Sequence, residues 1–259
     1  MSLNLQKLSI CLCTYNGEDF IRKQLESILS QKNFELIGEI IICDDCSDDS
    51  TSKIIKKIAI KNRKIKFIKN KYRLGVKKNF EKCLALTKFP IIALCDQDDM
   101  WSQFKVKKIM NNQEVLKTKP MALIHNAALI NSDDKVINNN FMKQRGGFSS
   151  SIFKNFYKNS YLGCCLVLNS SLKKEVLPFP KFLPQHDIWI GIVASLSAET
   201  IFLDENLTFY RRHTKNVSNA SKNIRSNYLK VFKFRLMFLY CILVHLIRKL
   251  NNLYFFKKI

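Results

Sequence analysis

The run Ile91-Ile92-Ala93-Leu94-Cys95-Asp96-Gln97-Asp98-Asp99 decides how this sequence folds. Its apolar first part predicts a short strand buried on both faces, as in a parallel sheet covered by helices. Three carboxylates in four residues follow at the carboxyl end. Because such carboxylates repel one another unless a cation holds them, and because Mg²⁺ and Mn²⁺ prefer oxygen ligands, this turn favours a divalent metal site. The alternative is a solvated acidic turn at the start of the helix after Trp101.

Short apolar runs alternate with helical patterns through the first hundred residues. The runs are Leu8 to Thr14, Ile37 to Cys43, Ile65 to Ile68 and Pro90 to Cys95. This alternation predicts an α/β fold of successive βαβ units on a central, mainly parallel sheet flanked by helices. Ligands of such sheets bind outside the carboxyl ends of the strands. The loops after Cys13, Cys43 and Cys95 are therefore the expected place for a functional site.

A second acidic cluster, Asp44-Asp45-Cys46-Ser47-Asp48-Asp49-Ser50-Thr51, follows the second of these runs. Two acidic loops at neighbouring strand ends are unexpected in a chain whose formal net charge is +22, so the acids are concentrated where a site should lie. A carboxylate there can accept hydrogen bonds from a base or a ribose hydroxyl, and a helix N-terminus can face phosphate oxygens.

The second half has a less regular pattern. We expect a helix from Ser102 to Leu116, strands at Met121 to Ile130 and Leu162 to Leu168, a short helix from Ser170 to Leu177, and an amphipathic helix that His186 and Asp187 open. No internal repeat and no low-complexity linker interrupts the chain. One catalytic domain over residues 1–220, followed by a tail over 221–259, is the expected organisation.

The tail is strongly basic and rich in aromatic residues. No acidic residue follows Glu205, and from Asn227 onward apolar residues interleave with lysines and arginines, as in an interfacial amphipathic helix. We therefore predict contact with an anionic membrane surface; the alternative is packing on the catalytic domain or on a second subunit. The apolar run Leu236 to Ile247 is too short to span a bilayer, which takes about 20 residues.

Two further features concern the compartment. The nine cysteines sit mostly inside apolar runs, which is typical of thiols in a reducing environment. Met1 to Lys7 has no apolar core of signal-peptide length. We therefore expect a cytoplasmic protein, peripheral at the inner face of the cytoplasmic membrane.

The successive blocks of this chain resemble those of the inverting family 2 glycosyltransferases with the GT-A (Rossmann-like) nucleotide-diphospho-sugar transferase fold, and within them the rhamnosyltransferase-like bacterial enzymes. The blocks, in order, are Thr14-Tyr15-Asn16-Gly17, Asp44-Asp45-x-Ser47-x-Asp49-x-Thr51, Cys95 to Trp101, Gly163-Cys164, His186-Asp187-Ile188-Trp189, Tyr210-Arg211-Arg212-His213 and Asn216-Val217-Ser218. The resemblance runs from about Leu8 to Ser218, and the joint occurrence of the blocks makes it specific.

This resemblance implies a role for individual residues. The nucleotide-sugar side comprises Thr14, Tyr15, Asn16, Asp44, Asp45, Arg73 and Asp96, with Asp45 at the base. Asp98 would bind the divalent metal that bridges the diphosphate, with Asp96 close to the ribose or the metal and His213 as a further ligand. Asp187 would be the catalytic base that takes the proton of the acceptor hydroxyl.

Each of these assignments has a structural alternative. Asp187 is equally suited to cap the helix that follows it. His186 either orients Asp187 or packs in the core, and an orienting role is favoured. Arg73 is equally plausible as a solvated loop residue, and His213 as a surface histidine among basic neighbours.

Two sequence features that accompany processive sugar synthesis are absent from this chain. The chain has no Q-x-x-R-W block and no membrane-spanning run, so it predicts the addition of a single sugar rather than processive synthesis. We expect dTDP-rhamnose or a UDP-hexose as donor, and a glycan or lipid-linked acceptor of cell-surface polysaccharide or lipooligosaccharide biosynthesis. A nucleotidyltransferase is the alternative, although no Gly-rich phosphate loop follows the first strand. Net charge alone suggests a nucleic-acid-binding protein, but no nucleic-acid-binding motif accompanies it, so no such partner is expected.

Overall fold

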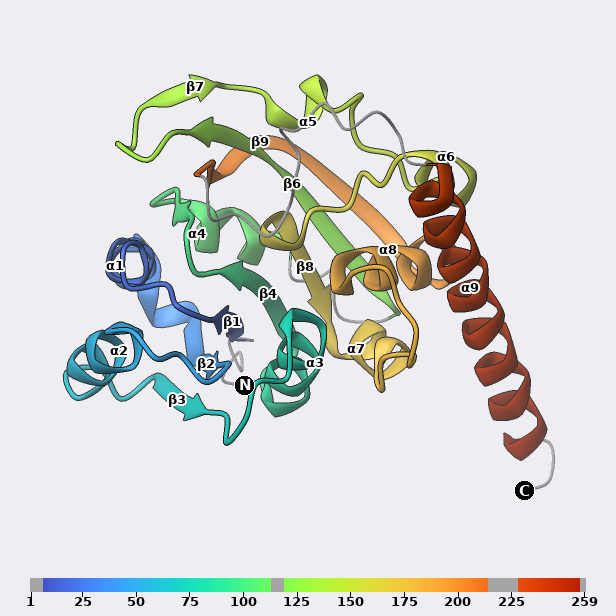
Figure 1. The fold of residues 1–259 in the computed structure, drawn as a ribbon, viewed down its shortest axis with the longest axis horizontal. Coiled ribbons are helices and arrows are strands. Elements are labelled where there is room, and N and C mark those ends of the chain that lie inside the picture. Colours follow the sequence, from blue (N-terminus) through green and yellow to red (C-terminus); the bar gives the residue numbers. More distant parts are fainter. Residues whose placement is uncertain (1–6, 113–118, 214–227, 257–259) are drawn as a thin grey trace, which may run out of the picture.

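The structure, a computed structural model, describes residues 7–112, 119–213 and 228–256, with side chains up to residue 251. A single curved sheet runs through the molecule, with helices on both faces (Figure 1). The strands lie in the order β3-β2-β1-β4-β8-β6-β9-β5, and β7 pairs with β6. The bounds are β1 Leu8–Thr14, β2 Ile37–Asp44, β3 Ile65–Lys69, β4 Ile91–Asp96, β5 Met100–Trp101, β6 Met121–Ile130, β7 Val136–Asn138, β8 Leu166–Asn169 and β9 Glu199–Arg211.

The sheet is parallel in its first half and mixed in its second. Strands β3, β2, β1 and β4 are parallel neighbours, as the alternating pattern predicted. Beyond β4 the strand β8 is antiparallel, and β6 pairs antiparallel with β8 but parallel with β9. The predicted α/β fold is confirmed, and the parallel part is the part that carries both acidic loops.

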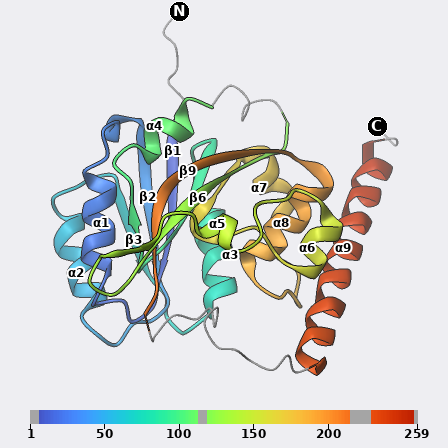
Figure 2. The same ribbon diagram turned by 90° about the horizontal axis from the view of Figure 1, so that it is seen from above.

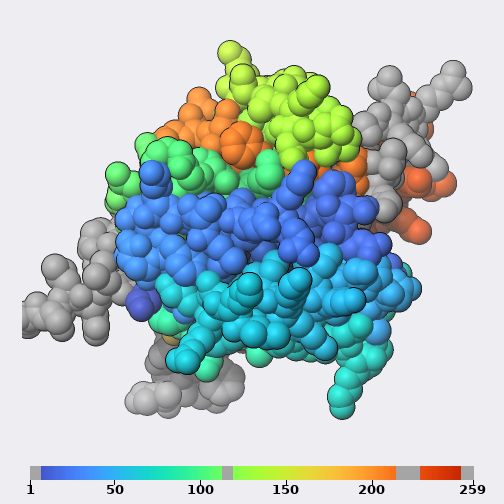
Figure 3. Space-filling view, turned by 90° about the vertical axis from the view of Figure 1, so that its left-hand side faces the viewer, coloured from blue at the N-terminus to red at the C-terminus, as the bar shows by residue number. Residues whose placement is uncertain are grey.

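Two layers of helices cover this sheet. Helices α1 (Ile21–Leu29), α2 (Thr51–Ala59) and α4 (Lys105–Met110) share one core with one face of the sheet. Helices α3 (Val76–Leu86), α5 (Phe141–Gln144), α7 (Ser170–Val176) and α8 (His186–Ser197) share a second core with the other face. The short α6 (Ile152–Tyr157) lies beside α8 (Figure 2). Because both faces are covered, β1 and β6 are buried along their whole lengths. Seen from the side of α1 and α2, the early part of the chain, in blue and cyan, forms the middle and lower part of the surface, and later segments, in lime and orange, lie above it (Figure 3).

Three elements differ from the sequence-based expectation. The helix predicted from Ser102 begins at Lys105 and ends at Met110, while residues 113–118 of the prediction lie outside the described part. The strand predicted from Leu162 begins with a 3-10 turn at Gly163–Cys165 and is extended only over Leu166–Asn169. Helix α8 is not amphipathic: it is buried on almost every side, because it is packed between the sheet, α7 and α9.

The C-terminal helix α9 (Tyr228–Phe256) packs along α8 at the edge of the molecule (Figures 1 and 2). It buries Phe238, Cys241 and His245 against the domain. In the described ranges, no helix combines the length and the apolar character that a membrane crossing requires. The predicted boundary between domain and tail at residue 220 falls in the stretch 214–227, outside the described residues, as does the block at Asn216 to Ser218.

Candidate active site

The acidic loop after β4 is partly buried, with Asp99 at its innermost point. Asp96 ends β4, and the short β5 pairs with β9, which holds the loop between them. Asp99 is fully buried; its Oδ1 accepts a hydrogen bond from the Arg211 backbone N–H at 3.0 Å, and its Oδ2 has no hydrogen-bond partner. Burial, followed by the negative charges of Asp98 and Asp96, raises the pKa of Asp99 well above its usual range. The loop therefore holds carboxylates that the protein does not fully neutralise.

The predicted metal ligands Asp98 and His213 lie side by side. The His213 Nε2 is 2.9 Å from the Asp98 Oδ2, although the two residues are far apart in sequence. The imidazole ring also packs against the ring of Phe20, with the centroids 4.6 Å apart. The His213 side chain is thus held beside the acidic loop and is not a free surface histidine.

Asp187 lies close enough to Asp96 for its charge to act on that carboxylate. Burial, then the charge of Asp98 and then the charge of Asp187, raise the pKa of Asp96 to about 8. For this effect the carboxylates of Asp98 and Asp187 must both lie near Asp96. The structure therefore brings Asp96, Asp98, Asp187 and His213 into one place.

Asp187 does not cap its helix as the alternative reading supposed. The residue before α8 is Gln185, whose side chain makes no cap hydrogen bond, and Asp187 lies inside the first turn. Its Oδ1 is 2.8 Å from the Ile188 backbone N–H. The Asp187 carboxylate therefore lies at the positive end of the helix dipole.

His186 packs in the core rather than orienting Asp187. Its ring stacks on Phe80 at a centroid distance of 3.8 Å and an interplanar angle of 10°, and neither ring nitrogen has a hydrogen-bond partner. Burial lowers the pKa of His186, so the ring is neutral. Gly163 makes room for it, because a Cβ there would lie 2.9 Å from the His186 Nε2. The favoured orienting role is therefore not supported.

The nucleotide-side acids, by contrast, are satisfied by the protein. Asp45 accepts hydrogen bonds from the Asn70 side chain at 3.0 Å and from the backbone N–H groups of Leu74 and Gly75 at 2.7 and 2.8 Å. Asp44 accepts from Ser47 and, at 2.8 Å, from the Ser52 hydroxyl. These carboxylates fix the loops around the strand ends.

The loop after β1 is fastened to the acidic loop after β4. The Gln97 Oε1 accepts hydrogen bonds from the Thr14 hydroxyl at 2.6 Å and the Tyr15 backbone N–H at 2.8 Å. Asn16 has a positive φ of 45°, and its side chain accepts from the Asp48 backbone N–H at 3.1 Å. The exposed Arg73 lies over the Tyr15 ring, with its guanidinium carbon 3.9 Å from the centroid. The residues predicted at the nucleotide are thus gathered at one edge of the sheet.

Lys105 and Arg211 received no role from the sequence, yet both lie fully buried beside the acids. The Lys105 Nζ donates to the Cys164 carbonyl at 3.0 Å and contacts the Thr208 hydroxyl at 2.8 Å. The Arg211 Nε donates to the Asp98 carbonyl at 2.8 Å, and its guanidinium pairs with Asp134. No signal in the sequence distinguishes Lys105 from its exposed neighbours; the position of Arg211 in the Tyr210 to His213 block is the only hint.

Comparison with known proteins identifies the family. The profile described as glycosyl transferase family 2 matches residues 9–153, which is more than half of the chain. This chain belongs to glycosyl transferase family 2. It is 32% identical over 237 residues to the Escherichia coli UDP-Glc:alpha-D-GlcNAc-diphosphoundecaprenol beta-1,3-glucosyltransferase WfaP, a match that covers 87% of this chain and 86% of that protein. It is 26% identical over 242 residues to the Shigella flexneri dTDP-rhamnosyl transferase RfbG, covering 85% and 78% of the two chains.

The solved structures agree on the fold of this glycosyltransferase. The S. aureus TarS fragment 1–349 in complex with UDP-GlcNAc superposes with a TM-score of 0.66 at 18% sequence identity. That match covers 90% of this chain and 66% of the TarS chain. The predicted resemblance to GT-A family 2 enzymes is therefore confirmed, and the chain is a glycosyltransferase that uses a nucleotide sugar. Neither the nucleotidyltransferase nor the nucleic-acid-binding alternative is supported.

The acids of this family 2 enzyme suit a divalent cation. Three possible ligand atoms, a carboxylate oxygen of Asp96, a carboxylate oxygen of Asp99 and the Cys164 Sγ, all lie within 4.8 Å of one another. The unpartnered buried oxygen of Asp99 and the mutual repulsion of the carboxylates are what a bound cation would relieve. Asp99 and Cys164 were not among the predicted ligands, and only the fold shows that they are close to Asp96.

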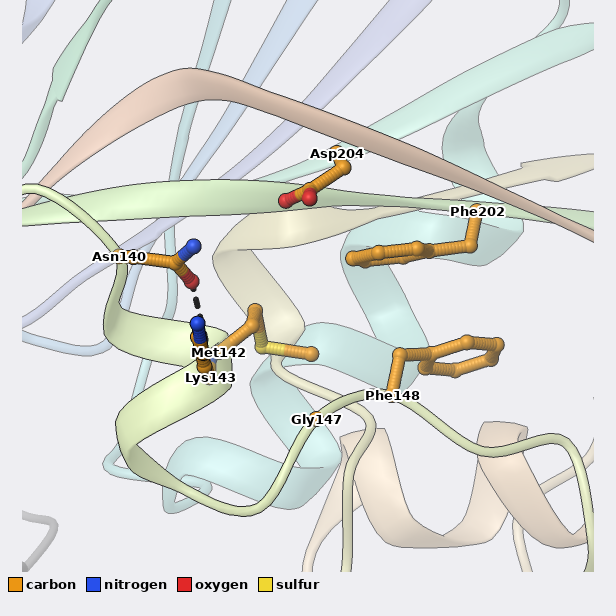
Figure 4. Close-up of a pocket in the computed structure, with 7 residues that line it drawn as sticks. All are labelled: Asn140, Met142, Lys143, Gly147, Phe148, Phe202 and Asp204. Carbon is orange, nitrogen blue, oxygen red and sulfur yellow. Dashed lines mark hydrogen bonds between the residues drawn. The ribbon is translucent and has the colours of Figure 1, made fainter.

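A small cavity of about 190 Å³ lies elsewhere on the enzyme, between α5 and β9. Its lining comprises Asn140, Met142, Lys143, Gly147, Phe148, Phe202 and Asp204, with the ring of Phe202 stacked over the ring of Phe148 (Figure 4). None of the predicted site residues contributes to this lining.

Proposed function

We propose that this enzyme is an inverting, metal-dependent glycosyltransferase that adds a single sugar to an acceptor hydroxyl. The observation that carries the proposal is the convergence of Asp96, Asp98 and Asp187, where burial and then the charges of the other two carboxylates raise the pKa of Asp96 to about 8. A carboxylate cluster with an adjacent imidazole is a donor set suited to Mg²⁺ or Mn²⁺.

Asp96, Asp98 and His213 would hold the divalent ion. When bound, the ion stabilises the negative charge that develops on the departing diphosphate. Asp187 accepts the proton of the acceptor hydroxyl, which attacks the anomeric carbon on the face opposite the diphosphate. Its position in the first turn of α8, beside the Ile188 backbone N–H, holds the Asp187 carboxylate in place for this task. The buried Lys105 ammonium group lies near Asp96 and Asp99, and burial lowers its pKa.

The nucleotide binds in this proposal at the edge formed by Thr14, Tyr15, Asn16, Asp44 and Asp45. The Arg73 guanidinium lies over the Tyr15 ring, and in this proposal it contacts the nucleotide from there. The names of the two relatives support dTDP-rhamnose or a UDP-hexose as donor, so the transferred sugar is rhamnose or a hexose.

We place the reaction in cell-surface polysaccharide or lipooligosaccharide biosynthesis, at the cytoplasmic face of the membrane, with a glycan or lipid-linked acceptor. The diphosphoundecaprenol in the name of WfaP supports an acceptor of that kind. The catalytic domain would comprise residues 1–220. The basic side chains of the tail 221–259 would attract anionic lipid, and each lysine or arginine near the membrane surface would contribute about 1 kcal/mol to the free energy of binding.

The test is release of nucleoside diphosphate from a panel of UDP, dTDP and GDP sugars with Mn²⁺ or Mg²⁺ and a lipid-linked acceptor. The proposal predicts release that depends on metal and acceptor, and that Asp187→Asn reduces by about 10²- to 10⁴-fold. The neighbouring Gln185→Ala is the control, since Gln185 makes no side-chain cap. Full activity after metal removal, or an active Asp187→Asn enzyme, would contradict the proposal.

A further inference from the structure

A thiol lies beside the acids of the loop after β4. A carboxylate oxygen of Asp96, a carboxylate oxygen of Asp99 and the Cys164 Sγ are all within 4.8 Å of one another. We call these three residues the inner triad. Within the described residues, no other group of three or more histidine, cysteine, aspartate or glutamate side chains brings its ligand atoms this close together. The proposed reaction uses only Asp96 of the three, so Asp99 and Cys164 have no function in it.

The inner triad is assembled from three segments that the fold holds together. Asp96 ends β4, Asp99 precedes β5, and Cys164 lies in the 3-10 turn Gly163–Cys165 that leads into β8. Because β8 pairs antiparallel with β4, this turn is fixed against the carboxyl end of β4. Cys164 is buried, whereas Asp96 is only half-buried, so an ion reaches the triad from the side of Asp96.

The protein does not satisfy the inner triad with its own groups. Asp99 is fully buried; its Oδ1 accepts the Arg211 backbone N–H, and its Oδ2 has no hydrogen-bond partner. The nearby Lys105 does not fill this gap, because its Nζ bonds to the Cys164 carbonyl oxygen and to the Thr208 hydroxyl. A buried carboxylate oxygen without a partner costs free energy, so its presence points to a ligand from outside the chain.

The donor atoms favour Zn²⁺ over Mg²⁺ or Mn²⁺. Zn²⁺ binds thiolate and carboxylate ligands together, whereas Mg²⁺ and Mn²⁺ prefer oxygen alone. Tetrahedral zinc, with bonds of about 2.0–2.3 Å, separates its ligand atoms by about 3.3–3.6 Å. Ligand atoms that are at most 4.8 Å apart therefore need only small side-chain movements to close on the ion. Water can fill the fourth position on the half-buried side of Asp96.

We propose that the inner triad is a Zn²⁺ site and that zinc bound there inhibits the transferase. The Cys164 thiol gives its proton to solvent as its bond to zinc forms. The inhibitory part rests on the proposed function, in which Asp96 also holds the catalytic cation. A zinc ion that draws Asp96 towards Asp99 and Cys164 takes a ligand from the cation held by Asp98 and His213, and its charge repels that cation.

Cobalt spectroscopy of the reduced full chain tests the site without using activity. Co²⁺ stands in for Zn²⁺, and a thiolate bound to Co²⁺ gives an intense near-ultraviolet charge-transfer band that oxygen ligands do not give. We expect this band at one Co²⁺ per chain, and Zn²⁺ should displace the cobalt. Cys164→Ala should abolish the band, whereas Cys46→Ala, which removes a half-buried thiol in the other acidic loop, should keep it.

Asp99→Asn provides a second variant in case Cys164→Ala folds poorly. It keeps an acceptor for the Arg211 backbone N–H but removes a charged ligand from the triad. Zn²⁺ affinity, measured by competition with Co²⁺, should fall at least about 10-fold, since loss of even an outer-shell partner weakens metal sites by that factor. The zinc site is overturned if the natural chain gives no thiolate band. It is equally overturned by a band of full strength in Cys164→Ala, because the ion would then lie on other thiols.

Inhibition is measured separately, as the Zn²⁺ concentration that halves Mn²⁺-dependent release of nucleoside diphosphate. For Asp99→Asn this concentration, taken relative to the variant's own Mn²⁺-dependent release, should rise at least about 10-fold. A thiolate band without inhibition by zinc would overturn the inhibitory role. Release that needs no Mn²⁺, together with an intact band, would instead contradict the proposed function and leave the zinc site standing.

Discussion

The two acidic loops of this enzyme differ in how the protein treats their charge. In the loop after β2, Asp44 and Asp45 accept hydrogen bonds from side chains and backbone N–H groups. In the loop after β4, Asp99 keeps a buried oxygen without a partner, and burial, followed by repulsion from Asp98 and Asp187, raises the pKa of Asp96. Carboxylates that the protein satisfies fix loop geometry, whereas carboxylates left unsatisfied require something from outside. The comparison separates the acids that hold the loops of the nucleotide edge in shape from the acids that leave charge for a cation, which the sequence alone does not.

The largest effect should come from Asp98 in the unsatisfied loop. Asp98→Asn removes a charge from the metal-binding donor set, and we expect kcat/KM to fall by about 10²- to 10³-fold while the unfolding midpoint changes little. Steady-state kinetics with a saturating donor measure this. Asp48→Asn, an exposed acid of the other loop, is the matched control and should retain full activity. Equal losses in both variants would remove the distinction between the loops.

The pH dependence of metal binding should be steep. A cation that binds at Asp96 must displace a proton from a group whose pKa is about 8, so Mn²⁺ affinity should rise by up to about 100-fold from pH 6 to pH 8. Calorimetry in buffers of different ionisation enthalpy would show release of nearly one proton per metal at pH 6. Binding without proton release at that pH would refute the assignment to Asp96.

The same pKa makes a prediction for the metal-free protein. The folded chain binds the Asp96 proton more tightly than the unfolded chain, whose Asp pKa is about 3.9. The contribution of Asp96 to the free energy of unfolding should therefore fall as pH rises from about 4 to about 8 and then level off. Urea titrations of the natural chain and of Asp96→Asn measure it: the slope with pH should be smaller in the variant.

Asp45 in the satisfied loop should matter for stability. Asp45→Asn turns an acceptor of three hydrogen bonds into a side chain with one acceptor oxygen, and we expect a loss of about 2 kcal/mol in the free energy of unfolding. Chemical denaturation followed by circular dichroism tests this, with Asp48→Asn as the control. An unfolding midpoint that does not move would show that these hydrogen bonds do not hold the loop at residues 70–75.

The smallest effect is expected at Arg73. Arg73→Ala removes the guanidinium over the Tyr15 ring, and UDP or dTDP should bind about three- to tenfold more weakly. Stability should not change, because Arg73 is exposed. Titration calorimetry with the free nucleotides measures the affinity. Unchanged nucleotide affinity would mean that Arg73 is only a loop residue.

The sequence predicts the parallel half of this fold well, for a physical reason. Strands buried on both faces read as continuous apolar runs, and parallel topology brings their carboxyl ends, with Asp45 and Asp96, to one edge. What lies beneath the acids could not be predicted. Lys105 has the pattern of a surface helix residue, and its burial depends on Cys164 and Thr208, which are distant in sequence. The packing of His186 on Phe80 is equally a product of long-range contacts.

The most direct test of the central claim is the position of a bound cation. Anomalous scattering from a crystal containing Mn²⁺ and UDP should place the ion against Asp96 and Asp98, with His213 beside it and Asp187 within the same cleft. An ion found instead at the Asp44 to Asp49 loop, or Mn²⁺ absent from the acids after β4 when the nucleotide is bound, would contradict the account.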